Sequence, residues 1–207
     1  MTTGKLRLGV LGGTFDPIHA AHLQAAAAAR DSLHLNRVLF IPAGDPWRKR
    51  DRRVTPAEHR LAMVQAAIEA CGDPSFEVSD LEVRRAGATY TSDTLRELRQ
   101  QGDVALWFIL GADAVLDLPR WHEPGVIIQL ARLAVVPRPG PPVDVGALDD
   151  LVPGLSAAID SVAMEPIDLS ATELRARLLA PDRLAVDERV PAGARKYIVE
   201  HDLYRPA

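Results

Sequence analysis

The chain has 207 residues, 28 acidic and 24 basic side chains, a formal net charge of -4 and a single cysteine. This length suits one domain with a buried core, and we expect residues 1–207 to form it, with a helical part from about 168 to the end. The negative charge argues against general nucleic-acid binding, which needs a basic surface. No apolar run is long enough for a membrane span and no secretory signal is recognised, so we expect a cytoplasmic protein. Cys71 cannot form an internal disulfide, and we expect it to be buried.

Short apolar runs alternate with segments of helical periodicity along the chain. The predicted elements are a strand over 5–11, a helix over 20–33, a strand over 38–42, a helix from Pro56 to Gly72 with Thr55 as its N-cap, a strand over 76–83, a helix that follows 89–93 and ends near 101, and strands over 104–110 and 133–136. Residues 144–159 are the least readable and allow one short helix. We then expect a last strand over 162–164, a helix that begins at Ser170 and a final helix over 192–201.

This alternation predicts an α/β fold, a Rossmann-like doubly wound parallel sheet with a short C-terminal helical extension. In such a sheet, a ligand binds beyond the carboxyl ends of the strands, where the strand order reverses. The polar segments that follow the predicted strands should therefore gather at one edge. These segments are 14–22, 44–49, 89–94, 111–113 and Arg138.

The first of these segments has the most specific pattern. The first strand stops at Gly12 and Gly13, which let the backbone approach a ligand closely, and His19 and His22 follow on the first turn of a helix. A helix N-terminus suits phosphate, and histidines at i and i+3 share a face. The pattern is neither the dinucleotide fingerprint nor the P-loop. A tight turn with solvated histidines is the alternative for the glycine pair alone, and a metal site is disfavoured because Asp16 is the only further ligand nearby.

The whole string from 12 to 22, Gly-Gly-Thr-Phe-Asp-Pro-Ile-His-Ala-Ala-His, resembles the opening motif of the nucleotidylyltransferase superfamily, and most closely that of bacterial nicotinate-nucleotide adenylyltransferases. One position departs, because Ala21 stands where the family has glycine. The resemblance implies that the two histidines are catalytic and that this segment binds ATP. The implied ATP-binding residues are Gly12, Gly13, Thr14, Phe15, His19 and His22.

A basic run over 48–53 follows the second strand. A solvated loop is the usual explanation of such a run. The family has a lysine at this place, and the resemblance implies that Lys49 is catalytic, reaching the triphosphate and the mononucleotide. Arg48 stands near a family histidine that this chain lacks, and could replace it as a phosphate donor.

Two further segments resemble ATP-binding parts of the family. Residues 111–113, Gly-Ala-Asp, resemble its Gly-x-Asp, and 169–175 resemble the superfamily's Ile-Ser-Ser-Thr-x-Ile-Arg. Ala171 replaces one serine of the second motif. An ordinary capped helix start is the alternative there. The resemblance adds these residues to the ATP site: Gly111, Asp113, Ser170, Thr172 and Arg175.

The remaining matches concern the mononucleotide. Residues 89–95 resemble the segment that helps to hold it, although an ordinary N-cap by Thr91 or Ser92 explains the same pattern. Trp121 matches a tryptophan that stacks on the nicotinate ring, where core packing is the alternative. Arg138 matches an arginine near the mononucleotide phosphate. The implied mononucleotide-binding residues are Asp16, Lys49, Thr89, Tyr90, Trp121 and Arg138.

The resemblance implies adenylyl transfer from ATP to nicotinate mononucleotide, a step of NAD biosynthesis, with Mg²⁺ bound through the ATP phosphates and no metal site of the protein itself. The expected partners are these two substrates, without nucleic acid or membrane, and a homo-oligomer is left open. Two alternatives remain. One is a related adenylyltransferase that acts on nicotinamide mononucleotide or phosphopantetheine, and the other is a non-catalytic dinucleotide-binding module.

Overall fold

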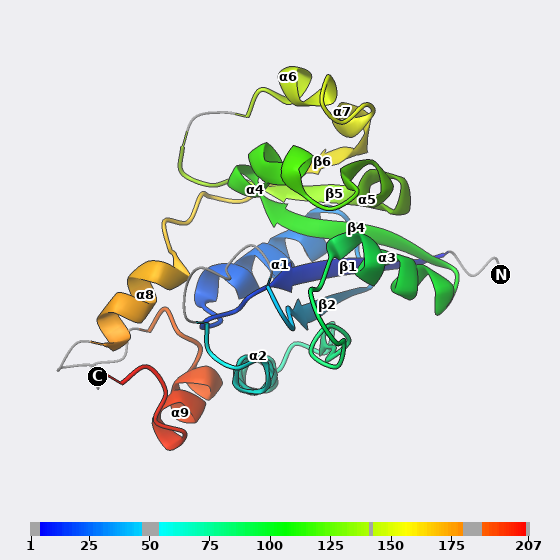
Figure 1. The fold of residues 1–207 in the computed structure, drawn as a ribbon. Helices are drawn as coiled ribbons and strands as arrows, with labels where there is room; N and C mark the ends of the chain where they lie inside the picture. Colours follow the sequence, from blue (N-terminus) through cyan, green and yellow to red (C-terminus); the bar gives the residue numbers. More distant parts are fainter. Residues whose placement is uncertain (1–4, 47–53, 141–142, 180–187, 206–207) are drawn as a thin grey trace.

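The computed structural model describes residues 5–46, 54–140, 143–179 and 188–205. Within them, six strands form one sheet in which every neighbouring pair is parallel (Figure 1). The order across the sheet is β3-β2-β1-β4-β5-β6, so the direction of winding reverses between β1 and β4. The strands are β1 Leu6–Gly13, β2 Arg37–Pro42, β3 Phe76–Val78, β4 Val104–Gly111, β5 Ala131–Val136 and β6 Ile159–Ser161.

Helices cover both faces of this sheet. One face is covered by α1 Ala20–Ser32 and α2 Ala57–Cys71, and the other by α3 Thr91–Gln100, α4 Ala112–Asp117, α5 Pro124–Leu130, α6 Val145–Asp149 and α7 Leu155–Ala158. Helices α8 Ala171–Leu178 and α9 Ala192–Glu200 add buried side chains to the core of the first face. A 3-10 turn, Leu118–Arg120, joins α4 to the following loop. None of the helices in the described ranges is long and apolar enough to span a membrane.

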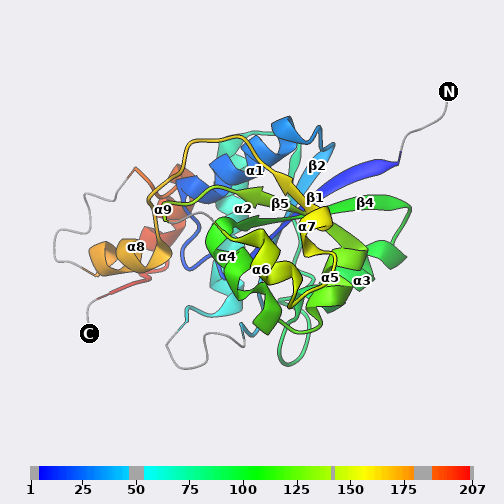
Figure 2. The same ribbon diagram turned by 90° about the horizontal axis from the view of Figure 1, so that it is seen from above.

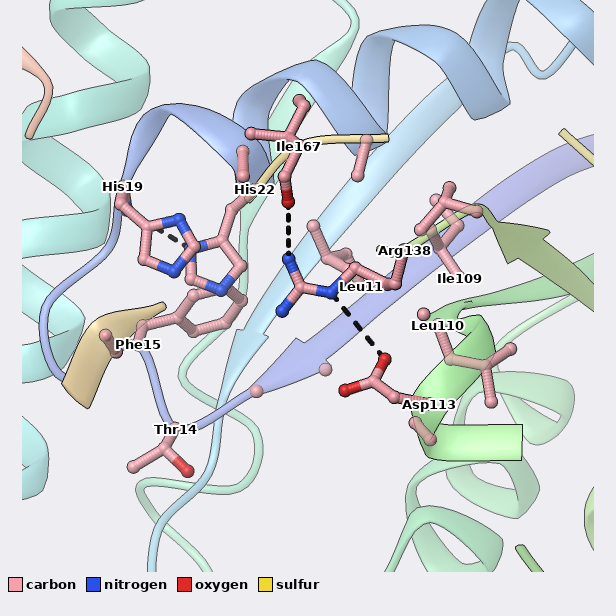
Figure 3. Close-up of a pocket in the computed structure, with 18 of the residues that line it drawn as sticks. Leu11, Thr14, Phe15, His19, His22, Ile109, Leu110, Asp113, Arg138 and Ile167 are labelled. Atoms are coloured by element: carbon pink, nitrogen blue, oxygen red, sulfur yellow. Dashed lines mark hydrogen bonds and ion pairs between the residues drawn. The ribbon is translucent and has the colours of Figure 1, made fainter. Parts of the chain in front are cut away.

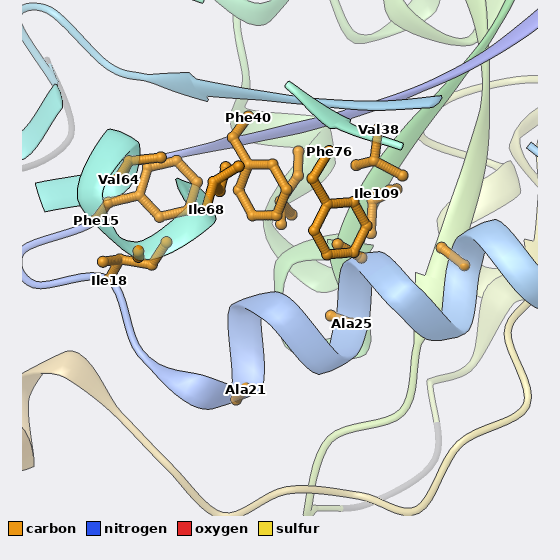
Figure 4. Packing of buried hydrophobic residues seen from close by; sticks show 14 of the residues in the cluster. Phe15, Ile18, Ala21, Ala25, Val38, Phe40, Val64, Ile68, Phe76 and Ile109 are labelled. Atoms are coloured by element: carbon orange, nitrogen blue, oxygen red, sulfur yellow. The ribbon is translucent and has the colours of Figure 1, made fainter. Parts of the chain in front are cut away.

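The two faces hold separate hydrophobic cores because side chains alternate along each strand. On β4, Trp107 and Ile109 belong to the core under α1 and α2, whereas Phe108 and Leu110 belong to the core under α3 and α5. Figure 4 shows the first core, in which Phe40 and Phe76 pack between the sheet and α1. The doubly wound parallel sheet predicted from the sequence is therefore confirmed.

Several predicted boundaries were wrong. The strand predicted over 76–83 ends at Val78, because the Ser79 hydroxyl accepts a hydrogen bond from the Leu81 N–H (3.2 Å) and turns the chain. The last strand lies at 159–161 instead of 162–164. The region 144–159 contains two short helices, α6 and α7, instead of one.

Two local expectations for α2 were also wrong. Thr55 does not cap the helix; Pro56 occupies the N-cap position, and the Thr55 carbonyl instead accepts from the buried Arg60 guanidinium (2.8 Å). Cys71, expected inside, is the exposed last residue of α2. Ser170 does cap α8, where its hydroxyl accepts from the Glu173 N–H at 3.2 Å.

The C-terminal helices lie beside the carboxyl end of β1. Both views place α8 and α9 next to the start of α1, at the edge to which the parallel strands point (Figures 1 and 2). The Ala20 N–H at the start of α1 donates to the Arg189 carbonyl, just before α9, at 2.7 Å. The C-terminal part of the chain therefore borders the edge where the topology places a ligand.

Candidate active site

A cavity of about 540 Å³ opens at the carboxyl ends of β1, β4 and β5, where the strand order reverses. This is the expected ligand position for an open parallel sheet, and the volume is that of a small-molecule site. Its walls include the following residues of the predicted site: Gly12, Gly13, Thr14, Phe15, Asp16, His19, His22, Gly111, Asp113, Trp121, Arg138 and Arg175.

The loop between β1 and α1 has an unusual backbone. Phe15 has a φ of 50°, in the left-handed region that costs a non-glycine residue about 1–2 kcal/mol. Its ring is buried in the core, where Figure 4 shows it near Ile18 and Val64. It lies edge-on to the His22 ring, with centroids 4.9 Å apart. Phe15 therefore offers a ligand its backbone and not its ring. The preceding carbonyl, that of Thr14, accepts from Arg60 at 2.7 Å.

His19 and His22 come together at the start of α1. His19 is the N-cap residue, His22 lies in the first turn, and their rings stack with centroids 3.7 Å apart. The His19 N–H donates to Nδ1 of His22 at 3.1 Å. Burial, with a smaller contribution from the Arg138 charge, lowers the pKa of His19 to about 4, so this ring is neutral at pH 7.

Arg138 supplies the positive charge opposite this pair. Figure 3 shows its guanidinium between the histidines and Asp113. It donates to the carbonyls of Ile167 and Leu169, both at 3.3 Å, and its Nε lies 3.6 Å from Asp113 Oδ1. This places Arg138 in the larger cavity.

Helix α8 adds a second arginine. Nη1 of Arg175 donates to the Asp16 carbonyl at 2.6 Å, and Nη2 donates to the Thr172 hydroxyl at 3.1 Å. Ala171 and Arg175 line the cavity, whereas Ser170 and Thr172 are not part of its wall. The geometry thus brings Arg175 to the predicted ATP site and leaves the two hydroxyl residues beside it.

A smaller cavity of about 180 Å³ lies on the other side of the glycine turn. It is lined by Thr89 just before α3, by Thr91 and Thr94 in the first turn of α3, and by a buried carboxylate, Glu82. The two cavities share five wall residues, Gly12, Gly13, Thr14, Phe108 and Trp121. Trp121 therefore lies between them, edge-on to Phe108 at 5.9 Å, and its Nε1 is buried with no hydrogen-bond partner among the described residues.

Four other predicted residues need separate comment. Tyr90 lines neither cavity, and its ring packs against His122 with centroids 4.3 Å apart. Lys49 and Arg48 fall outside the described residues, so their predicted roles stay predictions. Asp16 borders the larger cavity, but its carboxylate is 3 % exposed and accepts from the Tyr204 hydroxyl at 2.7 Å.

Sequence reasoning missed two buried charged residues. Arg60 is 1 % exposed and donates to the carbonyls of Thr14, Gly44 and Thr55, which ties together the loops after β1 and β2. Its position four residues before the buried Val64, on the apolar side of α2, was the available signal. Glu82 accepts from the Thr94 hydroxyl at 2.6 Å, and burial raises its pKa.

The fold and this site are those of a nucleotide-binding transferase, and comparison with known proteins agrees. A family model described as cytidylyltransferase-like matches residues 10–177. A protein of Dehalococcoides mccartyi named probable nicotinate-nucleotide adenylyltransferase is 43 % identical over 203 residues, covering 97 % of this chain and 98 % of its own. A Roseiflexus protein of the same name is 46 % identical over 201 residues, covering 96 % and 98 %. The chain therefore belongs to the nicotinate-nucleotide adenylyltransferase family within the cytidylyltransferase-like group.

Solved structures share the fold. The nicotinic acid mononucleotide adenylyltransferase of Plasmodium falciparum complexed with NaAD superposes with a TM-score of 0.76 at 20 % identity, over 96 % of this chain and 97 % of that one. A putative nicotinate-nucleotide adenylyltransferase from Vibrio parahaemolyticus gives a TM-score of 0.65 at 16 % identity, over 97 % and 96 %. At these identities the likeness concerns the fold alone.

Proposed function

We propose that the protein transfers the adenylyl group of ATP to nicotinate mononucleotide, giving nicotinate adenine dinucleotide and pyrophosphate. The observation that carries this proposal is the shared wall of the two cavities. The larger one has the histidine pair and two arginines, and the smaller one has threonines at a helix start. Two nucleotides that occupy these cavities meet at Gly12–Thr14, where the phosphate-binding motif lies.

The chemistry requires little of the protein beyond positioning. An oxygen of the mononucleotide phosphate attacks the α-phosphorus of ATP, the new P–O bond forms, and the bond to the β-phosphate breaks to release pyrophosphate. The attacking phosphate is already an anion near neutral pH, so no general base is needed. We assign His22 and Arg175 to charge stabilisation on the ATP phosphates, with Lys49 and the backbone of 12–15.

Mg²⁺ enters with ATP in this proposal. It favours octahedral oxygen ligands, keeps several waters and is commonly held by substrate phosphates with few protein ligands. Among the described residues, no group of three or more His, Cys, Asp or Glu side chains is placed to hold a metal ion. When bound with ATP, Mg²⁺ would neutralise phosphate charge, and we propose that the protein acts around it through His22, Arg138 and Arg175.

The mononucleotide is assigned to the smaller cavity. Trp121 offers an aromatic face to a pyridine ring, and Thr89 and Thr91 line the same space. Hydroxyls and backbone amides at a helix start suit a carboxylate. We therefore propose that the start of α3 reads the carboxylate of nicotinate, in a cytoplasmic enzyme.

The experiment is pyrophosphate release from ATP and Mg²⁺ with three separate acceptors: nicotinate mononucleotide, nicotinamide mononucleotide and phosphopantetheine. We expect the nicotinate form to react fastest. A preference for another acceptor would retain the phosphate site and overturn the assignment of the smaller cavity. If no acceptor gives pyrophosphate release but the protein binds a dinucleotide measurably, the proposal is wrong and the protein is a non-catalytic binding module.

A further inference from the structure

The loop that carries the histidines is tied to the far end of the chain. The Tyr204 hydroxyl donates to Oδ1 of Asp16 at 2.7 Å, and Asp16 is 188 residues earlier in the sequence. Arg175 donates to the carbonyl of the same residue at 2.6 Å and lies 3.9 Å from its Oδ2. The Thr55 N–H lies 3.4 Å from Oδ2 as well. Asp16 therefore has its carboxylate and its carbonyl both directed at protein groups.

Tyr204 itself is held in place by the packing of the C-terminal helix. Helix α9 lies so close to α2 that a Cβ on Gly193 would stand 1.9 Å from the Ala66 carbonyl oxygen, which only glycine permits. The chain then turns back, with the Leu203 N–H donating to the Ile198 carbonyl at 3.0 Å. Burial, together with the adjacent Asp16 carboxylate, raises the pKa of Tyr204, so its hydroxyl keeps its proton.

A buried carboxylate that loses a hydrogen-bond partner is costly, so the loop must move or admit water when the Tyr204 hydroxyl is removed. Asp16 comes one residue after the left-handed Phe15 and three before the N-cap His19. A strained conformation of this kind persists only where its surroundings over-determine it. Small displacements of catalytic groups reduce rate strongly, even when they originate away from the reacting atoms.

We propose that Tyr204 is a positioning residue: through its hydrogen bond to Asp16, the C-terminal segment fixes the loop that carries His19 and His22. Tyr204 lines neither cavity, so it acts without touching a nucleotide. This assigns Asp16 to the support of the loop and not to direct contact with the mononucleotide. The inference rests on the proposed function for its kinetic consequence, but the order of the loop can be measured without any substrate.

The test compares Tyr204→Phe with Tyr197→Phe. Tyr197 is a matched control, because its hydroxyl lies 3.0 Å from Nδ1 of His59 and neither residue lines a cavity. We measure kcat and KM for ATP, and amide hydrogen exchange over residues 14–23 without nucleotide. Tyr204→Phe should lower kcat on the order of tenfold with a smaller change in KM, and should speed exchange in this segment. Tyr197→Phe should match the wild type in its kinetic constants and in its hydrogen exchange.

A second pair of variants keeps the inference testable if Tyr204→Phe folds poorly. Asp16→Asn retains an acceptor for the Tyr204 hydroxyl and should lose less kcat than Asp16→Ala. Combining Tyr204→Phe with Asp16→Ala should lose no more than Asp16→Ala alone, because both remove the same contact. Additive losses, or a Tyr204→Phe enzyme with wild-type exchange over 14–23, would overturn the inference. An inactive wild type with faster exchange in Tyr204→Phe would reject the proposed function and leave the tie to Asp16 intact.

Discussion

The imidazole rings of His19 and His22 lie face to face, 3.7 Å between centroids, and Nδ1 of His22 accepts a hydrogen bond from the His19 N–H. An Nδ1 that accepts carries no proton, so the neutral His22 ring holds its proton on Nε2. His19 is also neutral at pH 7, because its pKa is about 4. Two charged rings at this separation would repel each other. In the proposed function, the pair therefore offers a phosphate N–H donors, while the full positive charges come from Arg138 and Arg175.

This arrangement predicts a specific effect of replacing His22. His22→Ala removes the Nε2–H donor and should lower kcat by about 10²–10³-fold, the effect of losing one preorganised donor to a developing charge. The melting temperature should change little, because His22 is partly exposed. The control is His34→Asn. His34 is an exposed turn residue with a positive φ, which asparagine tolerates, so this variant should retain wild-type turnover. Near-normal turnover in His22→Ala would remove this residue from the site.

The buried His19 predicts a pH dependence of stability. Its pKa is lowered from 6.5 to about 4, so between these values the unfolded chain binds the proton more readily than the folded one. The free energy of unfolding should therefore fall as the pH drops from about 6.5 to 4, by roughly 3 kcal/mol at the low end for a shift of this size. Urea unfolding at several pH values tests this. His19→Asn should show a shallower fall than the wild type, and identical slopes would contradict the burial-induced shift.

Features that are set within one short segment of the chain can be predicted from the sequence, and contacts between distant segments cannot. The glycine turn and the histidines at i and i+3 were correctly placed, because both are set within one strand–turn–helix unit. Helices α4 and α5 were missed, since Pro119, Pro124 and Gly125 break the segment into pieces too short for helical periodicity. The role of Asp16 was assigned without its partner, because no local pattern reports a contact with Tyr204 across 188 positions.

Arg60 also makes contacts with distant residues that no local sequence pattern reports, and these contacts lead to a stability prediction. Its guanidinium donates to three backbone carbonyls, at 2.8, 2.7 and 3.0 Å, and it is almost fully buried. Arg60→Met keeps a similar volume but leaves those carbonyls without their donor, and we expect a loss of about 3–5 kcal/mol in the free energy of unfolding. Arg37→Met is the control: this exposed arginine pairs with Glu77, and such pairs contribute about 0–1 kcal/mol. Equal losses in urea unfolding would contradict the role of Arg60.

Because Arg138 lines only one of the two cavities, its replacement can show kinetically which substrate each cavity binds. The sequence resemblance assigned it to the mononucleotide phosphate, but it lines only the larger cavity, whereas Thr89 lines only the smaller one. Arg138→Met should therefore raise KM for ATP about tenfold or more and leave KM for nicotinate mononucleotide nearly unchanged, because a charge-assisted contact contributes about 1.5–3 kcal/mol. Thr89→Val should raise KM for nicotinate mononucleotide and leave KM for ATP nearly unchanged. An Arg138→Met enzyme with a raised KM for the mononucleotide alone would restore the assignment made from the sequence and would extend the acceptor site into the larger cavity.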